Sequence, residues 1–598
     1  MHFPNRPLPL ALVDAANRAD ATRGYTFVAE DGVTETFYSF THLGEEVARR
    51  GAALLRLGLL PGERVAMIIP EGDDFVLTFL GAMHVGLVPV PMCPPMTLGK
   101  LGNFLDTAKH IIRKSESAGL VCSAQVLNVL GSLVDSQLRV VVASEQLPLD
   151  DTQAPIANLT ADHPAFIQFT SGSTSKPKGV VLTHGNLAAN AHCIMNLGLQ
   201  ATPDDVGCSW LPFYHDMGLI GFVLAPIVTD TPVAFMQPLA FIKRPAQWLH
   251  MITRHKGTIG FGPNFAYGLC ASRIKDRHLE GVDLSSWRVA GCGAEPIQLD
   301  VLQKFADRFD DYGFRAEAFM PCFGMAESTL AVTFHDLGEK PRADRVCLES
   351  LTKEHVAVPV TEDHDGETAS FVCCGRPFPG HDLGIQGEDG TLLGDRAVGE
   401  IVIKGPSVMN GYFKDDDTTG RTIDADGWLH TGDKGYVADG ELYVCGRIKE
   451  MIIVAGRNYY PTDLEWACNE IPGVRKGNII AFSVGDFGEQ ERVIVTVESK
   501  ADPDDYDRIR KDIKAKVLST VGLKVSEVVV LEPGSLPKTS SGKLQRSKTK
   551  QMYLDGALEG AHRGDGRLGL VTHLAKSQWG LLKHRVRSTF TSSRPSAR

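Results

Sequence analysis

The segment AFIQFTSGSTSKPKGVVLTHGNL, residues 165–187, holds the most distinctive loop of the chain. Two short apolar runs flank nine positions that contain two glycines, four hydroxyl side chains and two lysines. Glycine lets backbone N–H groups approach a ligand closely. Together with hydroxyl and ammonium groups, such N–H groups form a nest that suits a polyphosphate. The pattern G-x4-G-K-[ST] is absent, so this is not a Walker A loop. The alternative for the loop alone is a solvent-exposed turn.

Apolar runs typical of buried strands alternate with helical patterns along the chain. Examples are RVAMIIP (64–70), GLVCS (119–123) and RVVVAS (139–144), the first followed by the helical pattern FVLTFLGAMHVG. This alternation predicts an α/β fold with a largely parallel sheet. Turn-rich segments between short strands after about residue 370 predict a small β region. Strands and a charged helix after Gly446 predict a compact α+β unit.

Length and composition describe an ordinary globular protein with more than one core. The chain has 598 residues, of which 43% are apolar, and it is too long for a single domain. No apolar run reaches the roughly 18–20 residues of a membrane span. The N-terminus has no signal-peptide pattern, so we expect a cytoplasmic protein. The twelve cysteines are scattered without a CxxC pair, which favours reduced, buried thiols over disulfides or a zinc site.

Charge is distributed unevenly. The net charge is −11, but the segment from Ala557 onward has eight lysines and arginines against Glu559 and Asp565. The rest of the chain is therefore acidic and lacks the basic stripes of a nucleic-acid-binding domain. We expect the basic tail to be a solvated extension, with contact to an acidic carrier protein or anionic lipid as the alternative.

Six further motifs accompany the loop in a fixed order. They are WLPFYHDMG (210–218), GCGAEP (291–296), CFGMAEST (322–329), LHTGD (429–433), GRIKEMIIVAGRNYYPTDLE (446–465) and LPKTSSGKLQR (536–546). Across roughly residues 25–555 this series resembles the adenylate-forming superfamily, which includes acyl-CoA synthetases, luciferases and peptide-synthetase adenylation domains. The resemblance implies a large, multi-subdomain N-terminal adenylation domain at 1–447 with an insertion near 336–374. A small mobile α+β domain is expected at 448–556, and the flexible basic tail at 557–598.

The same resemblance assigns ATP contacts to matching positions of this chain. The β- and γ-phosphates are expected to contact Thr170, Ser171, Gly172, Ser173, Thr174 and Lys178. Ser175 stands where the family usually has glycine, and Lys176 is expected to contribute less than Lys178. The adenine pocket is expected to comprise Gly293, Ala294, Glu295, Phe323, Gly324 and Met325, with the ring of Phe323 stacked on the base.

Two acidic residues and an arginine complete the expected nucleotide site. The resemblance implies that Asp433 accepts hydrogen bonds from both ribose hydroxyls and that Arg447 contacts the ribose–phosphate side. Glu327 is expected to hold Mg²⁺, which prefers hard oxygen ligands. Outside their motifs, Asp433 would be read as a turn residue and Glu327 as a helix cap.

Three residues carry the expected chemistry and motion. Lys543, in the SSGK turn, is implied to be the catalytic lysine, with its ammonium between the attacking carboxylate and the α-phosphate. His215 is expected to close the acyl pocket or orient the carboxylate; a core histidine is the alternative. Lys449 lies at the family's hinge position, where rotation of the small domain would deliver Lys543 for adenylation and withdraw it for transfer.

The acceptor of the acyl group depends on the branch of the superfamily. Glu327 and Gly375 are 48 positions apart, an interval that CoA ligases cross with a markedly shorter segment, and the intervening residues resemble the insertion of fatty-acyl-AMP ligases. GRNYYPTDLE and PVPMCPP (89–95) fit the same branch. We therefore expect ATP-dependent activation of a medium- or long-chain fatty acid to an acyl-adenylate, with release of pyrophosphate. The acyl group is then expected to pass to the phosphopantetheine arm of an acyl carrier protein or of a carrier domain in a polyketide or peptide synthase.

Three alternatives to this function stay open at this point. The first is a fatty-acyl-CoA synthetase whose insertion arose by drift. A non-catalytic nucleotide-binding or carrier-docking protein is the second, although Lys543, Glu327, Asp433 and Arg447 are all present. The third is an amino-acid-activating domain. Apolar segments such as VAFMQPLAFI are expected to line an acyl tunnel, but they do not fix the chain length of the substrate.

Overall fold

The predicted phosphate loop lies between two paired strands in the sequence. The computed structural model describes residues 3–18, 20–70, 72–95, 101–130, 137–170, 177–361, 363–454, 457–469, 471–485, 492–538 and 543–558. Strands β7 (Pro164–Thr170) and β8 (Lys178–Thr183) are antiparallel, with Thr170 opposite Lys178. Helix α6 (His184–His192) then begins at a capping box formed by Thr183 and Asn186.

A parallel sheet of four strands precedes this pair. Its order is β4-β3-β5-β6, and every pairing is parallel. The strands are β3 (Arg64–Ile68), β4 (Val88–Pro91), β5 (Gly119–Cys122) and β6 (Val140–Ala143), and the nearby helices are α2 (Phe40–Arg56), α3 (Asp73–His84), α4 (Leu101–Lys114) and α5 (Ala124–Leu130). Every residue of α3 from Phe75 to His84 is buried, as expected of a helix packed inside an α/β layer.

The second sheet has nine strands in the order β17-β14-β13-β12-β11-β9-β10-β1-β2. Its six central strands, from β13 to β1, are parallel neighbours, and antiparallel strands flank them. The strands are β1 (Gly24–Val28), β2 (Glu35–Ser39), β9 (Gly207–Ser209), β10 (Val233–Met236), β11 (Ile259–Gly262), β12 (Val289–Cys292), β13 (Phe319–Gly324), β14 (Ala331–Phe334) and β17 (Arg376–Pro377). The associated helices are α1 (Leu8–Arg18), α7 (Asp216–Gly218), α8 (Pro238–Lys243), α9 (Ala246–His255), α10 (Asn264–Arg273) and α11 (Leu299–Phe309).

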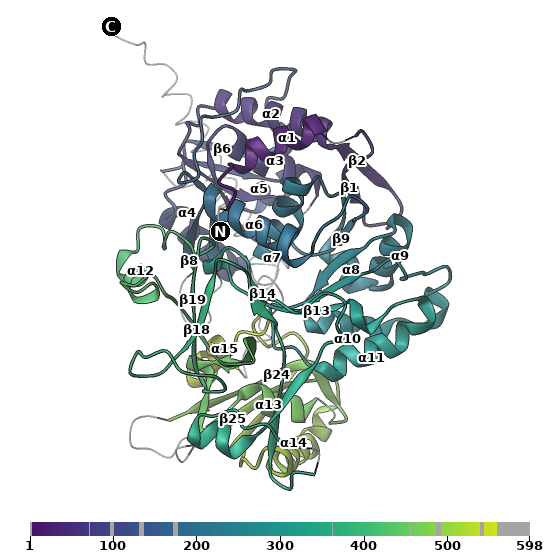
Figure 1. The fold of residues 1–598 in the computed structure, drawn as a ribbon, viewed down its shortest axis with the longest axis vertical. Coiled ribbons are helices and arrows are strands. Elements are labelled where there is room, and N and C mark those ends of the chain that lie inside the picture. Colours follow the sequence, from purple (N-terminus) through teal and green to yellow (C-terminus); the bar gives the residue numbers. More distant parts are fainter. Residues whose placement is uncertain are drawn as a thin grey trace.

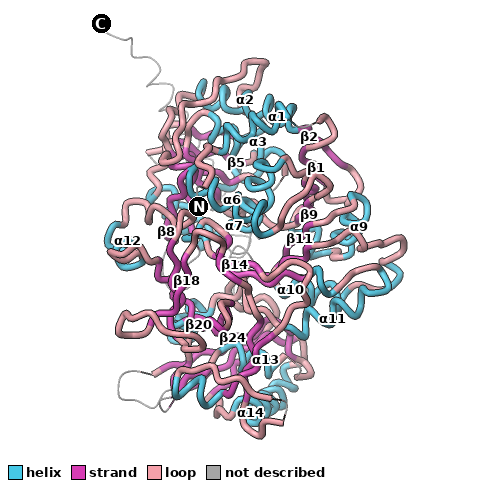
Figure 2. Tube along the Cα trace, viewed as in Figure 1, coloured by secondary structure: helices cyan, strands magenta, loops and turns pink. Residues whose placement is uncertain are grey.

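A small antiparallel region follows, as the turn-rich sequence predicts. Its four strands are β18 (Asp382–Gln386), β19 (Gly399–Lys404), β20 (Leu429–Ala438) and β21 (Glu441–Arg447), with helix α12 (Asp416–Thr422) between β19 and β20. The expected insertion contributes a separate pair, β15 (Ala343–Cys347) and β16 (Thr368–Val372). Figure 2 shows the magenta strands of this region on the left of the molecule, below β8.

The C-terminal part forms a small α+β unit at the bottom of Figure 1. Its elements are β22 (Ile452–Val454), β23 (Arg457–Tyr459), α13 (Pro461–Cys468), β24 (Val474–Val484), β25 (Arg492–Ser499), α14 (Tyr506–Val521), β26 (Glu527–Leu531) and α15 (Arg546–Leu554). Ile479, Val495 and Ile513 belong to an apolar cluster drawn only from this unit. The predicted α/β class, with parallel sheets, a small β region and a C-terminal α+β unit, is confirmed.

Two further sequence expectations concern cysteines and the membrane. All twelve cysteines are free, and nine of them are buried, which agrees with the expectation of buried thiols. Within the described part of the chain, no helix combines the length and the apolar character that a membrane span requires. The basic tail lies outside the described residues from 559 onward.

Candidate active site

The β7–β8 pair positions the two described residues of the predicted phosphate loop. Thr170 ends β7 and Lys178 begins β8, directly opposite each other. The Nζ atom of Lys178 lies 4.9 Å from the centroid of the Tyr412 ring, a distance at which a cation is attracted to the ring face. Of the seven residues between the strands, Pro177 is described, and the other six lie outside the described residues: Ser171, Gly172, Ser173, Thr174, Ser175 and Lys176.

Tyr412 also contacts the predicted metal ligand. Its hydroxyl donates a hydrogen bond of 2.8 Å to Oε1 of Glu327, and burial together with the Glu327 charge raises the pKa of Tyr412. The backbone is tied to the same place, because the N–H of Met409 donates to the carbonyl of Glu327 at 2.8 Å. Tyr412 therefore stands between the predicted phosphate lysine and the predicted magnesium ligand.

The residues of the predicted adenine pocket lie at the ends of two parallel strands. Strands β12 and β13 are neighbours, so the residues that follow them meet at one edge of the sheet. Gly293 follows β12, and a Cβ at this position would lie 2.6 Å from Sγ of Cys322. Ala294 has a φ of +69°, which is uncommon for a residue other than glycine. Position 293 therefore has no room for a larger side chain.

The aromatic motif occupies the end of β13. Phe323 is partly buried, and the chain bulges between Phe323 and Gly324. A Cβ on Gly324 would lie 2.0 Å from the carbonyl oxygen of Leu330, so only glycine fits there. Met325 donates its backbone N–H to the same carbonyl at 2.8 Å. The turn thus fixes where Phe323 and Glu327 lie relative to each other.

Asp433 and Arg447 face each other across strands β20 and β21. They are register partners, and Nε of Arg447 lies 2.9 Å from Oδ1 of Asp433. Asp433 is only 7% exposed. Burial raises the pKa of Asp433 to about 6, although the Arg447 guanidinium opposes the shift. The pair presents a buried anion and a half-exposed cation side by side at the end of the sheet.

Lys543 lies among carboxylates contributed by three distant segments. Burial lowers the pKa of Lys543, while the charges of Asp216, Glu295 and Asp433 oppose that shift. Glu295 is held in place by the N–H of Phe265, which donates to Oε1 at 2.6 Å. The charge of Arg447 adds to the lowering of the Lys543 pKa, so the three carboxylates offset this shift only in part.

His215 is paired with its neighbour in the sequence. Its Nδ1 atom lies 2.6 Å from Oδ1 of Asp216, which also accepts the backbone N–H of Met217 at 2.7 Å. Burial alone would raise the pKa of Asp216, but His215 and Lys543 together lower it. The pair fixes the orientation of the imidazole at the start of α7.

The predicted hinge residue, Lys449, is exposed and lies in the segment that connects the N-terminal part with the small C-terminal unit. Lys449 belongs to a short 3₁₀ turn, Ile448–Glu450, that connects β21 with β22. It is at the edge of the site, one residue from Glu450, whose charge acts on both Asp433 and Arg447.

The described donor set fits a magnesium ion that is also bound by phosphates. No cluster of three or more potential ligands is present among the described residues. Mg²⁺ is commonly held by one or two carboxylates together with substrate phosphates, and Glu327 provides one such carboxylate near Lys178 through Tyr412. A site built jointly by protein and nucleotide is therefore compatible with these residues.

Sequence reasoning missed several residues that the structure places in or beside the site. Asp216 lies inside the quoted motif WLPFYHDMG, next to His215, and was not assigned a role. Tyr412 lies in NGYF (410–413), which carries no obvious signal of its own, and only the fold brings it to Glu327. Arg546 ends the quoted motif LPKTSSGKLQR and forms ion pairs with Glu450 and Glu465.

Comparisons with known proteins agree along almost the whole chain. Residues 15–413 match the family described as AMP-binding enzyme, and residues 449–563 match the AMP domain of the Disco-interacting protein 2-like family. A Caulobacter vibrioides protein described as an acyl-CoA synthetase is 37% identical, with 86% of this chain and 90% of that protein covered. The medium-chain-fatty-acid–[acyl-carrier-protein] ligase JamA of Moorena producens is 33% identical, with 90% and 93% covered.

The fold has a match among solved structures. A chain from a structure of fatty acyl-adenylate ligases from E. coli and L. pneumophila superimposes with a TM-score of 0.87 at 34% identity. The match covers 92% of this chain and 99% of the other.

Proposed function

The chain belongs to the AMP-binding enzyme family, in its fatty-acyl-AMP ligase branch, and on that premise we propose that it activates a medium- or long-chain fatty acid for an acyl carrier protein. One observation carries the proposal: Lys543 of the C-terminal unit is near enough to Asp216, Glu295 and Asp433 of the N-terminal part for their charges to act on its ammonium group. This proximity supports the role of catalytic cation that the resemblance implies for Lys543.

In the first half-reaction the fatty carboxylate attacks the α-phosphorus of ATP. A bond forms between a carboxylate oxygen and this phosphorus, and the bond to the bridging oxygen of the β-phosphate breaks, so that pyrophosphate leaves. Lys543 holds a positive charge near the oxygens on which negative charge develops, and this kind of stabilisation is often the largest single contribution to catalysis. The contact with Asp216 restrains the imidazole of His215, which is proposed to orient the carboxylate.

The nucleotide is held by residues of the nine-stranded sheet, of the β18–β21 sheet and of the β7–β8 pair. Asp433 accepts the ribose hydroxyls, and Arg447 beside it contacts the ribose–phosphate side. The adenine is enclosed by Phe323, Gly324 and Met325 on one strand end and by Gly293, Ala294 and Glu295 on the other. Thr170 and Lys178 flank the polyphosphate loop.

Glu327 is the proposed protein ligand for Mg²⁺. The bound ion neutralises charge on the phosphates that it contacts. The hydrogen bond from Tyr412 leaves the Glu327 carboxylate in one orientation, and the cation–π contact of the same ring restrains Lys178.

The second half-reaction delivers the acyl group to a thiol. The sulfur of a phosphopantetheine arm attacks the acyl carbonyl, the bond from the carbonyl carbon to AMP breaks, and the thiol loses its proton. We propose residues 1–447 as the large domain and 448–556 as the small one, with Lys449 as the hinge between the half-reactions. The separate apolar cluster of the C-terminal unit supports this division.

Rigid attachment of the insertion supports the choice of a carrier protein over CoA. Arg342 forms an ion pair with Glu441, which is only 4% exposed. Asp344 accepts hydrogen bonds of 2.8 Å from Arg396 and from the hydroxyl of Tyr436. These contacts join the insertion firmly to the sheet that carries Asp433.

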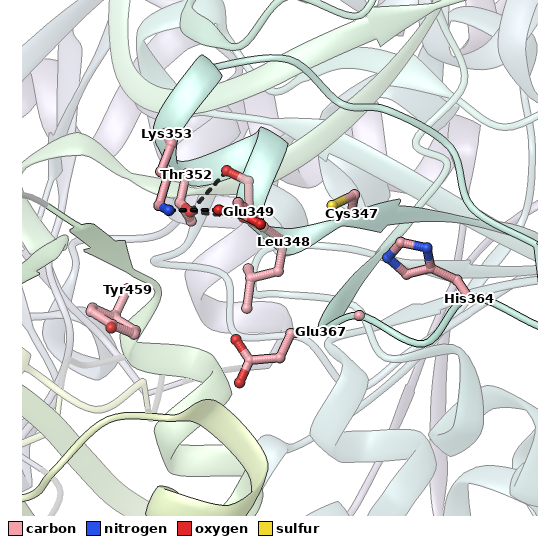
Figure 3. A pocket seen from close by; sticks show the side chains of 9 residues that line it. Cys347, Leu348, Glu349, Thr352, Lys353, His364, Glu367 and Tyr459 are labelled. Carbon is pink, nitrogen blue, oxygen red and sulfur yellow. Dashed lines mark hydrogen bonds and ion pairs between the residues drawn. The ribbon is translucent and has the colours of Figure 1, made fainter.

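The anchored insertion also meets the small unit. A cavity of about 270 Å³ lies between them, and Figure 3 shows Tyr459 of β23 across from Glu349 and Glu367 of the insertion. The Glu367 carboxylate also lies beside Gly522, since a Cβ on that glycine would be 2.8 Å from Oε1. An element anchored on one side and touching the small unit on the other restricts how that unit rotates.

A fatty-acyl-CoA synthetase is the second candidate, and the similarity to the Caulobacter protein favours it. One experiment separates the two: purified protein is incubated with ATP, Mg²⁺ and labelled lauric acid, with no acceptor, with CoA, or with a holo acyl carrier protein. Lauroyl-AMP that accumulates, persists in the presence of CoA and moves to the carrier supports the proposal. Rapid formation of lauroyl-CoA refutes the choice of acceptor, and failure to form any acyl-adenylate refutes the activity.

A further inference from the structure

Arg546 is the meeting point of three segments of the small unit. Its Nη2 atom lies 2.7 Å from Oε1 of Glu465 on α13, and Nη1 forms an ion pair with Oε2 of Glu450. The Nε–H donates to the carbonyl of Ala481 on β24 at 2.9 Å. A guanidinium suits this task because its donors form a rigid planar fork, whereas a lysine ammonium is a compact point charge.

Burial makes this cluster costly to disturb. The side chains of Arg546 and Glu450 are each 16% exposed, and that of Glu465 is 17% exposed. Burial raises the pKa of Glu465, and the charge of Arg546 opposes the rise. Oε1 of Glu465 also accepts the N–H of Ala481 at 2.9 Å. Without Arg546, the largely buried carboxylates of Glu450 and Glu465 would lose the cation that they share.

The cluster lies at one end of the loop that carries Lys543. Arg546 is the first residue of α15, three positions after the lysine. The loop closes where the N–H of Gln545 donates to the carbonyl of Pro537 at 2.9 Å. Its other arm is held by Glu498, which is fully buried and accepts the N–H of Leu536 at 2.9 Å. Both arms of the lysine loop are thus fixed by buried carboxylates.

The other end of the cluster lies at the proposed hinge. Glu450 follows Lys449 directly, and its charge also acts on Arg447 beside the nucleotide site. The guanidinium of Arg546 therefore joins the first residue beyond the hinge to the base of the Lys543 loop. Because this ionic link is direct, rotation at the hinge would move the base of the Lys543 loop with it.

We infer that Arg546 is a positioning residue, which couples the hinge to Lys543 through Glu450 and Glu465 so that all of them move as one rigid body. The inference rests on the proposed function, because it concerns the placement of Lys543 for adenylation. Arg546 itself is not assigned any contact with substrate. Its effect on the reaction is therefore expected to require Lys543.

A double-mutant cycle tests this dependence. Single-turnover formation of lauroyl-AMP is measured for the full chain, for Arg546→Gln, for Lys543→Ala and for the double variant. Arg492→Gln is the matched control, since Arg492 pairs with Glu527 at 2.9 Å in the same unit but is 55% exposed. Thermal melting checks that each variant folds, and Arg546→Lys replaces Arg546→Gln in the cycle if the latter does not fold.

The expected results follow from a displaced lysine. Arg546→Gln is expected to slow adenylation by about 10²-fold, the cost of a misplacement near 1 Å. In the Lys543→Ala background the same change is expected to slow it by about threefold or less, because the residue that it positions is already gone. Arg492→Gln is expected to stay near the wild-type rate.

Two outcomes overturn the inference, and they differ from failure of the proposed function. An equal loss from Arg546→Gln in both backgrounds would show a general structural role, and no loss in the wild-type background would show no role. If the wild-type protein forms no lauroyl-AMP, the proposed function fails, and the inference fails with it.

Discussion

Replacing Tyr412 with phenylalanine removes one hydroxyl from the site and leaves the rest of the ring in place. The lost group donates at 2.8 Å to Glu327, while the ring over Lys178 is retained. A hydrogen bond to a charged group contributes about 1.5–3 kcal/mol, which corresponds to about 10–150-fold in a binding constant. Because Tyr412 is only 6% exposed, water does not readily replace its hydroxyl. We expect the Mg²⁺ concentration for half-maximal adenylation to rise by about tenfold, the lower end of that range.

Pyrophosphate exchange at a series of Mg²⁺ concentrations measures this effect. Tyr436→Phe is the matched control, because the Tyr436 hydroxyl donates at the same 2.8 Å to a carboxylate, that of Asp344, but in the anchor of the insertion. Both substitutions are expected to lower stability to a similar extent, and only Tyr412→Phe is expected to change the magnesium requirement. Equal magnesium curves for the two variants would refute the assignment of Tyr412 as the residue that orients Glu327.

Three other changes test separate parts of the structure. Lys543→Ala is expected to slow adenylate formation by about 10²–10³-fold with little change in the KM for ATP. The reason is that the ammonium acts on charge that develops in the transition state. A change confined to KM would contradict that role. Arg342→Gln breaks the ion pair with Glu441 and is expected to raise acyl-CoA formation relative to carrier loading, whereas an unchanged product ratio would argue against control by the insertion. Burial raises the pKa of Asp463 from 3.8 to about 7. Since the folded state holds this proton more tightly, the protein loses unfolding free energy as pH rises from about 4 to about 7, by at most about 4 kcal/mol. In urea denaturation, the unfolding free energy of Asp463→Asn minus that of wild type is expected to grow across that pH range and then stay level. A difference in unfolding free energy that does not depend on pH would exclude this explanation.

Periodic patterns in the sequence were sufficient for the fold class. Alternating apolar runs and helical patterns predicted the parallel sheets, because a strand buried on both faces leaves a continuous apolar run such as RVAMI at 64–68. The order of strands in the nine-stranded sheet was not predicted. That order is set by contacts between segments far apart in the chain, such as β1 beside β10, and no local pattern records them.

Much of the candidate site was predictable because its residues lie in recognisable motifs. The charges of Glu295 and Asp433 act on Lys543, and Asp433 is paired with Arg447. Tyr412 could not be found in this way. Its role depends on a bridge between the loop at 409–413 and strand β8, where Val180 pairs with Tyr412, so only the tertiary structure reveals it.

Strand β21 carries contacts of different kinds at its two ends. Glu441 at its start holds the insertion, Arg447 at its end faces Asp433, and the turn that begins at Ile448 leads into the small unit. Seven residues of strand span about 20 Å, so the anchor of the insertion and the proposed nucleotide site are separated in space but belong to one strand. On the proposed function, changes in the insertion would act about 20 Å from the ribose-binding pair, so the acyl acceptor could change while acid activation is kept.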